Sequence, residues 1–206
     1  MIGLLYQFPT WIQRLYSGVV WRKEASSKVV YLTFDDGPIP ECTPAVLDIL
    51  GEAGVKATFF MVGENAERYA DLLARIREEG HGVGNHTYHH VKGCRCTREA
   101  YMRDVERADG VLRTRLFRPP HGRMKWSQKR ALLDAGYTIC LWDVLPHDYN
   151  ARYSAEDLLA IVKRYVRNGS IITLHDSLKS KERMLEALPK IIEYLKEEGM
   201  EFGLLK

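Results

Sequence analysis

Two histidines four residues apart, His86 and His90, have the side chains and the spacing to bind one metal ion. If they lie on a single helical turn, both imidazoles point to the same face. A carboxylate from elsewhere in the chain, Asp36, would complete a set of two histidines and one carboxylate. Such a set leaves positions open for water and substrate, as catalytic zinc and ferrous sites do. These residues therefore predict metal-assisted hydrolysis.

Two neighbouring carboxylates, Asp35 and Asp36, precede Gly37 and Pro38. Alone, this tetrapeptide is more typical of a turn than of a site. Adjacent carboxylates repel each other, however, unless a cation or a difference in role relieves the repulsion. One aspartate binding the metal while the other acts as a general base is such a difference.

Strand and helix patterns alternate along the chain and would position these residues. Short apolar runs that end in polar or glycine residues predict strands, and amphipathic segments between them predict helices. The expected strands are 29–34, 57–63, 81–85, 115–119, 137–144, 170–176 and 201–205, and the expected helices are 44–54, 64–80, 97–113, 126–136, 154–169 and 181–199. This alternation implies parallel strands joined by right-handed crossovers. We expect a β/α barrel rather than an open doubly wound sheet, because no Gly-x-Gly-x-x-Gly follows the first strand.

Polar residues gather where the expected strands end. They are Asp35, Asp36, Asn85, His86, His90, Arg118, Asp143, Asp148, His175 and Asp176. Active sites of barrels lie at the carboxyl ends of the strands. The sequence thus predicts one site that these loops share.

Length and composition limit the possibilities further. The 206 residues, 46% of them hydrophobic, suit a single domain, which we expect over 27–206, with 1–26 as an arm or short helix packed on it. The formal net charge of +3 is too small to predict binding to nucleic acid or to an anionic membrane. No run approaches the ~18 apolar residues of a transmembrane helix. The chain lacks a clear signal peptide, so a cytoplasmic location and export by an unseen leader both remain open. We expect a monomer.

The four cysteines, Cys42, Cys94, Cys96 and Cys140, lack the spacing of a zinc site. A core of this size needs no disulfide, so free thiols are expected.

Five segments resemble, in order, the motifs of the polysaccharide deacetylases, which contain the NodB homology domain and form carbohydrate esterase family four. They are TFDDGP at 33–38, HTYHH at 86–90, FRPPHG at 117–122, LWDVLPHDY at 141–149 and TLHDS at 173–177. The resemblance runs from about Val29 to the C-terminus. It implies a distorted, NodB-type barrel of about seven parallel strands. It also implies deacetylation assisted by one divalent ion, zinc first, with cobalt or nickel as alternatives.

The resemblance assigns the metal and base roles residue by residue. Asp36, His86 and His90 would hold the metal. Asp35 would be the general base, with Arg118 paired to it.

It also assigns the acid and the substrate contacts. His175 would be the general acid that protonates the leaving amine, oriented by Asp148. The backbone N–H of His121, which follows Pro120, would donate to the oxyanion, and Leu174 would line a small pocket for the acetyl methyl group.

Flat aromatic side chains supply candidate sugar contacts. Trp126, Trp142 and Tyr149 could stack on sugar rings or belong to the core. The chain departs from the family pattern where His121 replaces a tyrosine, Leu145 an aspartate and Tyr149 a tryptophan. These departures affect the sugar-binding wall rather than the predicted chemistry.

The resulting hypothesis is a hydrolase that removes acetyl groups from an N-acetylated glycan, either a chitooligosaccharide or a peptidoglycan-type chain. Two alternatives remain within hydrolases: cleavage of a small non-sugar amide, or of an O-acetyl ester such as acetyl-xylan. A third alternative is a sugar-binding protein without catalytic activity.

Overall fold

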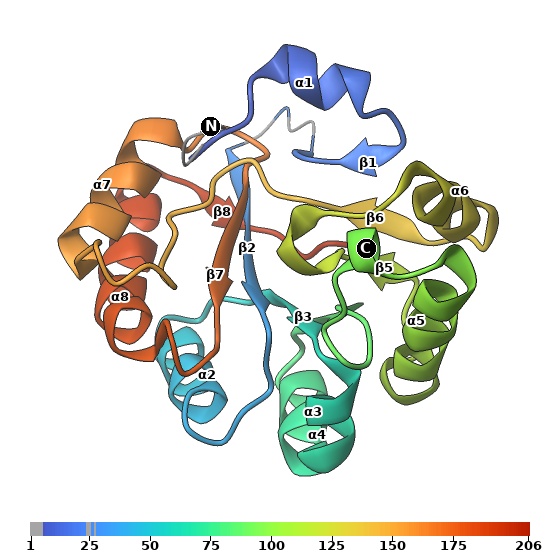
Figure 1. Ribbon diagram of the computed structural model, residues 1–206. Helices are drawn as coiled ribbons and strands as arrows, with labels where there is room; N and C mark the ends of the chain where they lie inside the picture. Colours follow the sequence, from blue (N-terminus) through green and yellow to red (C-terminus); the bar gives the residue numbers. More distant parts are fainter. Residues whose placement is uncertain (1–5, 24–25, 27) are drawn as a thin grey trace.

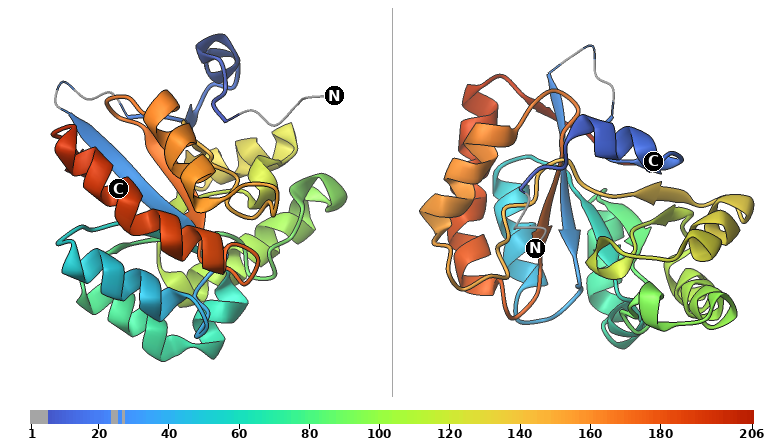
Figure 2. Two further views of the ribbon diagram at one scale, coloured as in Figure 1. Left: turned by 90° about the vertical axis from the view of Figure 1, so that its left-hand side faces the viewer. Right: turned by 45° about the horizontal axis from the view of Figure 1, so that its top comes forward.

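The computed structural model describes residues 6–23, 26 and 28–206, and residues 1–5 and 24–25 of the expected arm lie outside them. One curved parallel sheet forms the centre, with helices around its outer side (Figures 1 and 2). The strands are β1 (Val19–Val20), β2 (Val29–Asp35), β3 (Thr58–Met61), β4 (Gly82–Asn85), β5 (Leu116–Phe117), β6 (Thr138–Cys140), β7 (Ile171–His175) and β8 (Glu201–Phe202). The α-helices are α1 (Thr10–Leu15), α2 (Thr43–Glu52), α3 (Gly63–Arg68), α4 (Ala70–Glu78), α5 (Arg98–Leu112), α6 (Trp126–Asp134), α7 (Ala155–Tyr165) and α8 (Lys181–Glu197). Two 3₁₀ turns, η1 (Gly93–Arg95) and η2 (Pro120–Gly122), lie in the loops.

The strand order is β1-β6-β5-β4-β3-β2-β7, and β8 pairs with the first half of β2. All of these pairs are parallel, as the strand–helix alternation predicts. The sheet curves without closing through a continuous ladder. Between its two ends only isolated bridges occur in the described residues, at Arg22 with Ser170 and at Val144 with Ile172. The fold is therefore the expected distorted barrel.

The main core lies between the sheet and helices α2, α3, α4, α5, α7 and α8. Strand β2 lies between β3 and β7, also pairs with β8, and buries Val30, Leu32 and Phe34 completely. Leucine and isoleucine side chains at helical spacing, such as Leu188 and Ile191 of α8, pack in the same cluster. The buried frame fixes where the strands end, and with them the site.

Three local features differ from the expectations. The helix expected over 64–80 is divided into α3 and α4 at Tyr69, whose φ of −116° and ψ of 57° are not helical. The strand expected over 137–144 ends at Cys140. Beyond it, the Leu141 N–H donates a hydrogen bond to the Val20 carbonyl, and the Asp143 N–H donates one to the Ile171 carbonyl. The arm also adds a strand, because β1 pairs with β6.

The arm makes polar contacts with the domain. The hydroxyl groups of Tyr6 and Tyr153 lie 2.6 Å apart, and the Tyr6 carbonyl accepts a hydrogen bond from the Leu145 N–H. Gln13 of α1 donates to Asp143. Residues 6–22 thus pack against the loop that follows β6.

All four cysteines are unpaired, with Cys42 and Cys140 buried. Among the helices described, none combines the length and the apolar character needed to cross a bilayer.

Candidate active site

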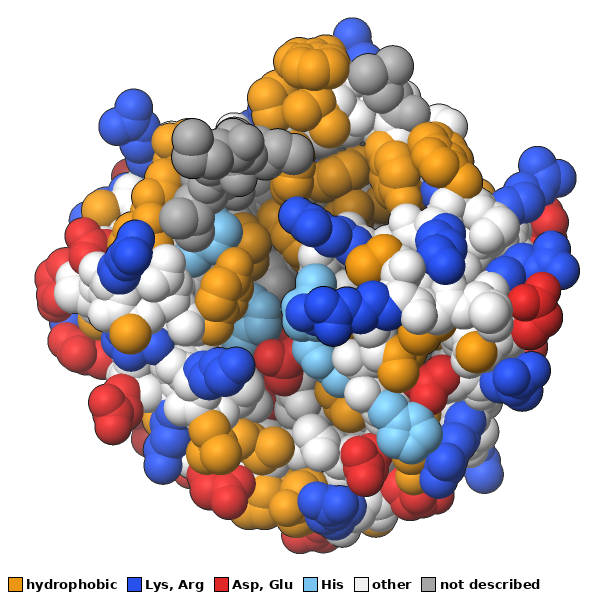
Figure 3. Space-filling model, viewed as in Figure 1, with side chains coloured by type: hydrophobic (Ala, Val, Ile, Leu, Met, Phe, Trp, Pro, Cys, Tyr) orange, Lys and Arg blue, Asp and Glu red, His pale blue; other side chains and the backbone are white. Residues whose placement is uncertain are grey.

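A cavity of about 300 Å³ opens at the carboxyl edge of the sheet. Figure 3 shows the hollow, with histidine and acidic side chains on its floor and apolar side chains on its rim. Its lining contains residues from five loops: Asp35, Asp36, His86, His90, His121, Trp142, Leu145, Tyr149, His175, Ser177 and Lys179. The structure therefore brings together most of the predicted site residues.

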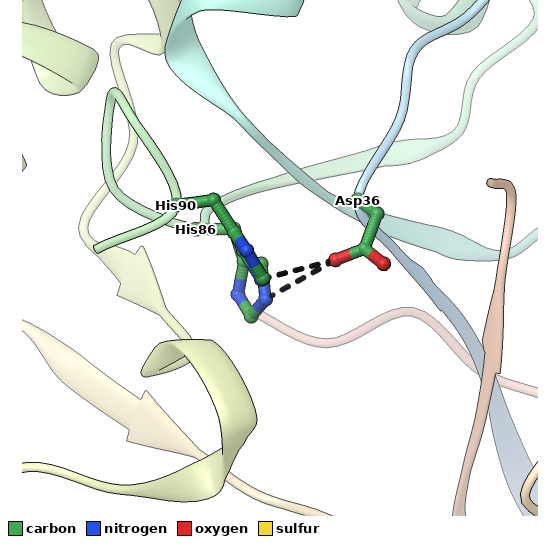
Figure 4. A group of neighbouring side chains, drawn as sticks. All are labelled: Asp36, His86 and His90. Carbon is green, nitrogen blue, oxygen red and sulfur yellow. Dashed lines mark ion pairs between the residues drawn. The ribbon is translucent and has the colours of Figure 1, made fainter. Parts of the chain in front are cut away.

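Asp36, His86 and His90 line this cavity, and the Asp36 carboxylate points toward the two imidazole rings (Figure 4). The Oδ1 atom of Asp36 is 3.2 Å from Nε2 of His90 and 3.8 Å from Nε2 of His86. One ligand atom from each of the three residues lies within 4.8 Å of the others. Two imidazole nitrogens and one carboxylate oxygen are donors that suit zinc, cobalt or nickel. The residues therefore fit a single divalent ion.

The two histidines do not reach this position through a helical turn, and that part of the sequence interpretation is wrong. Residues 86–90 form an irregular loop after β4. Thr87 and His90 have positive φ angles of 64° and 53°, which turn the chain back on itself. The Asn85 side chain stabilises this turn by accepting the Thr87 N–H and donating to the Val105 carbonyl.

The His86 ring is oriented by a backbone carbonyl. Its Nδ1 lies 2.8 Å from the carbonyl oxygen of Arg118, and since a carbonyl only accepts, Nδ1 carries the proton. Nε2 is left with its lone pair facing Asp36. Burial lowers the pKa of His86 to about 4, so the ring is neutral, as a metal ligand must be.

Asp36 is held as a carboxylate. Burial would raise its pKa, but the hydrogen bond from His90 and the positive charge of His175 lower it below its usual range. Its φ of 84° is unusual for a residue other than glycine and turns it away from the direction of β2.

The neighbouring Asp35 has a different partner. Nη1 of Arg118 donates to Oδ1 of Asp35 over 2.6 Å and also to the Thr33 hydroxyl. The remaining guanidinium nitrogens face the carbonyls of Cys140 and Leu141, and the group is fully buried. Arg118 thus lies beneath the cavity and fixes Asp35, as predicted.

His175 and Asp148 form a hydrogen-bonded pair at the cavity. Nδ1 of His175 is 2.8 Å from one carboxylate oxygen of Asp148, and the His175 N–H donates to the other. Burial alone would lower the pKa of His175, but the charge of Asp148 and the hydrogen bond to it raise this pKa to about 9. The imidazole is therefore protonated at neutral pH. Of the two ring nitrogens Asp148 contacts Nδ1 only, so the N–H at Nε2 is not bound by this carboxylate.

A buried aspartate that follows β7 positions the whole turn after β2. Asp176 accepts the Gly37 N–H and the Thr43 hydroxyl, and its own N–H donates to the Asp35 carbonyl. A Cβ atom on Gly37 would lie 1.9 Å from Asp176, so only glycine fits there. Sequence reasoning placed Asp176 at a strand end but gave it no role in the site.

The wall around His121 is built on a second glycine. His121 has a φ of 59°, and its ring centroid lies 4.8 Å from that of His90. Gly122, with a φ of 65°, packs flat on the Trp142 ring, where a Cβ atom would lie 2.5 Å from it. Burial lowers the pKa of His121 to about 4, and the nearby charges of His90, Lys92 and Arg123 contribute to this shift.

Some residues predicted to line the site lie outside the cavity. Leu174, expected to line a pocket for the acetyl methyl group, is fully buried in the main core. Leu145 and Trp142 supply apolar surface of the cavity instead. Pro120 lines an adjoining cavity, and the exposed Trp126 lies by an apolar groove with Tyr16.

Asp143 binds Arg167 and Ser170 instead of facing the cavity. Ser177 and Lys179 line it and were not foreseen, because both lie on a loop with no periodic pattern.

Comparison with known proteins shows which family the chain is similar to. Residues 22–140 match the sequence profile of the polysaccharide deacetylase family. The chain is 34% identical to a peptidoglycan-N-acetylglucosamine deacetylase of Bacillus cereus, over 89% of each protein. It is 33% identical to a chitooligosaccharide deacetylase of Bradyrhizobium sp., over 86% of this chain and 89% of that protein.

A solved structure has the same fold along nearly the whole chain. It is a peptidoglycan N-acetylglucosamine deacetylase in complex with a naphthalenyl N-hydroxybenzamide, with a TM-score of 0.88 and 32% identity. The alignment covers 95% of this chain and 94% of that one. From the profile match, the shared length and the shared fold, we conclude that this chain belongs to the polysaccharide deacetylase family.

Proposed function

We propose that this protein is a metal-dependent hydrolase that removes acetyl groups from N-acetylated sugars. One observation carries the proposal: a metal-binding set, a carboxylate fixed by a buried arginine and a protonated histidine all face one cavity. These three groups can carry out metal-assisted hydrolysis of an amide. A sugar-binding protein without catalytic activity would have no need of the complete set.

The ion would be held by Asp36, His86 and His90, and we propose zinc. When bound there, a divalent cation polarises the amide carbonyl and lowers the pKa of water. Asp35 would accept the proton of the attacking water, while Arg118 neutralises and orients its carboxylate. The His121 N–H would donate to the oxygen that develops negative charge.

The leaving amine needs a proton, and His175 would supply it. Asp148 engages Nδ1 and raises the pKa of the ring, so the proton at Nε2 is available to the substrate nitrogen. An ester substrate would depend less on this acid, because an alkoxide is a better leaving group than an amide anion. The protonated histidine therefore favours N-acetyl over O-acetyl substrates.

The aromatic rim favours a sugar over a small amide. Tyr149 is 40% exposed, and its ring lies edge-on to that of His175, with centroids 5.0 Å apart. Trp142 forms another part of the lining. Flat rings at the mouth of a polar cavity can stack on pyranose faces.

Acetate release tests the proposal directly. Metal-stripped protein is to be assayed on N-acetylglucosamine oligomers, peptidoglycan glycan strands, acetyl-xylan and small acetamides, with zinc, cobalt or nickel added back. We expect release from the N-acetylated glycans, with zinc restoring activity and chelation removing it. Acetate release from acetamides alone would refute the glycan assignment. No acetate release from any substrate would support the non-catalytic alternative.

A further inference from the structure

A second cavity, of about 320 Å³, adjoins the active site and is positively charged. The two cavities share the side chain of His121. The charged residues of the second cavity are Lys92, Arg95 and Arg123, and its lining includes no carboxylate. In Figure 3, Lys and Arg side chains lie on the rim of the central hollow beside histidine side chains.

These three cations are not paired within the part of the chain that the structure describes. Elsewhere in that part, arginines such as Arg75, Arg130 and Arg167 form ion pairs with carboxylates.

The two loops that carry the cations are fastened together. The side chain of Gln128, which is fully buried, accepts the Lys125 N–H and donates to the Gly93 carbonyl. The Lys125 ammonium donates to the Cys96 carbonyl. A Cβ atom on Gly93 would lie 2.7 Å from Gln128 and 3.1 Å from the Arg123 carbonyl.

Lys92, Arg95 and Arg123 are exposed, so solvent screens the repulsion among them. The hydrogen bonds of Gln128 and Lys125 keep the two loops together and with them the positions from which the three cations extend. A carboxylate bound in this cavity would meet positive charge from both loops.

We propose that Lys92, Arg95 and Arg123 form a subsite for a carboxylate on the glycan, within one sugar unit of the N-acetyl group that is hydrolysed. Guanidinium groups recognise carboxylates through paired hydrogen bonds, which suits two arginines at one site. The shared His121 puts the carboxylate beside the reacting sugar. This inference rests on the proposed deacetylase function and adds to it a preference for acidic over neutral glycans.

The carboxylate can come from an ether substituent on a neighbouring amino sugar or from a uronic acid unit. The chemistry recognised is the same, and substrates of both kinds distinguish the sources.

The test compares two substrates that differ only in charge. One is an alternating N-acetylglucosamine and N-acetylmuramic acid tetrasaccharide, and the other is the same molecule with its carboxyl groups amidated. For the wild type we expect KM to be about 10-fold lower for the acid form at low ionic strength, because charge-assisted hydrogen bonds from the exposed cations strengthen binding even though solvent screens them. The difference in KM should shrink in roughly 0.5 M salt, because added salt screens the attraction between exposed charges.

Substitution of the arginines should remove this preference. In the Arg95→Gln/Arg123→Gln double variant, we expect KM for the acid form to rise about 10-fold toward that of the amide, with kcat unchanged. The Arg95→Lys/Arg123→Lys variant keeps the charge and should restore part of the preference. Arg103→Gln removes one charge from an exposed position on α5, outside both cavities, and should alter neither KM.

Calorimetric binding of both tetrasaccharides separates the subsite from the deacetylation. Equal KM and Kd values for the acid and amide forms would overturn the subsite, even with full deacetylase activity. If the acid form instead binds more tightly through the two arginines while no acetate is released, that outcome would refute the proposed function but support the anion site. A uronic acid tetrasaccharide with N-acetyl groups, if it binds better than the muramic acid one, identifies the second source of the carboxylate.

Discussion

The pairing of His175 with Asp148 predicts how activity depends on pH. Asp148→Asn keeps the size of the side chain but removes its charge and one of its acceptor oxygens. The carboxylate raises the pKa of His175 to about 9 against the opposing effect of burial. Without it, burial remains, and the pKa should fall below the 6.5 of an unperturbed histidine.

A general acid must be protonated to act, so activity declines as the pH rises through its pKa. At pH 8, His175 with a pKa of about 9 is about 90% protonated, whereas with a pKa of 6.5 it is about 3% protonated. We therefore expect kcat of Asp148→Asn to fall about 30-fold at pH 8 and far less at pH 5.5. The alkaline limb of the profile should move down by about 2 pH units or more.

Two measurements check this reasoning. The first is the pH profile of acetate release by the zinc-loaded wild type and variant. The second is NMR titration of the His175 ring in the metal-free proteins. Asp134→Asn, at an exposed residue of α6 that pairs with Arg130, is the charge-matched control and should leave both unchanged. If Asp148→Asn leaves the alkaline limb and the titration of His175 where they are in the wild type, the assignment of Asp148 as the group that charges His175 is refuted.

Three further predictions concern the metal, the base and the turn after β2. Asp36→Ala or His86→Ala should abolish stoichiometric zinc binding, measured by elemental analysis after gel filtration, and full occupancy in either variant would remove that residue from the ligand set. Asp35→Asn should keep its zinc while acetate release falls ~10²-fold or more, and unchanged turnover would contradict its role as base. Gly37→Ala should lower the free energy of unfolding by about 2 to 4 kcal/mol in urea titrations, because the new methyl group displaces the buried Asp176 carboxylate and its hydrogen bonds. A loss below about 0.5 kcal/mol would show that the turn can relax.

The convergence of the site residues was predictable from the sequence because they lie at the carboxyl ends of strands or in the loops that follow them. Parallel strands bring their carboxyl ends to one edge, so Asp36 of one loop and His86 of another had to meet once the strands were identified. The placement of Arg118 beneath Asp35 followed from the family resemblance rather than from any local pattern. Its burial against backbone carbonyls is visible only in the structure.

Backbone geometry in the loops was not predictable. The spacing of His86 and His90 suits a helical turn, but positive φ angles at Thr87 and His90 produce the same convergence in an irregular loop. Likewise, no propensity marks Tyr69 as the break between α3 and α4. The turn at 86–90 is held in part by a hydrogen bond from Asn85 to the Val105 carbonyl, which joins residues far apart in the sequence.

The strand β1 also has a consequence for association between chains. Strand β6 would otherwise stand at the end of the sheet with unpaired N–H and carbonyl groups, which could pair with a strand of another molecule. Val19 and Val20 occupy that position, and β1 is too short to offer a long ladder itself. The N-terminal arm thereby protects the sheet from aggregation by edge-to-edge pairing.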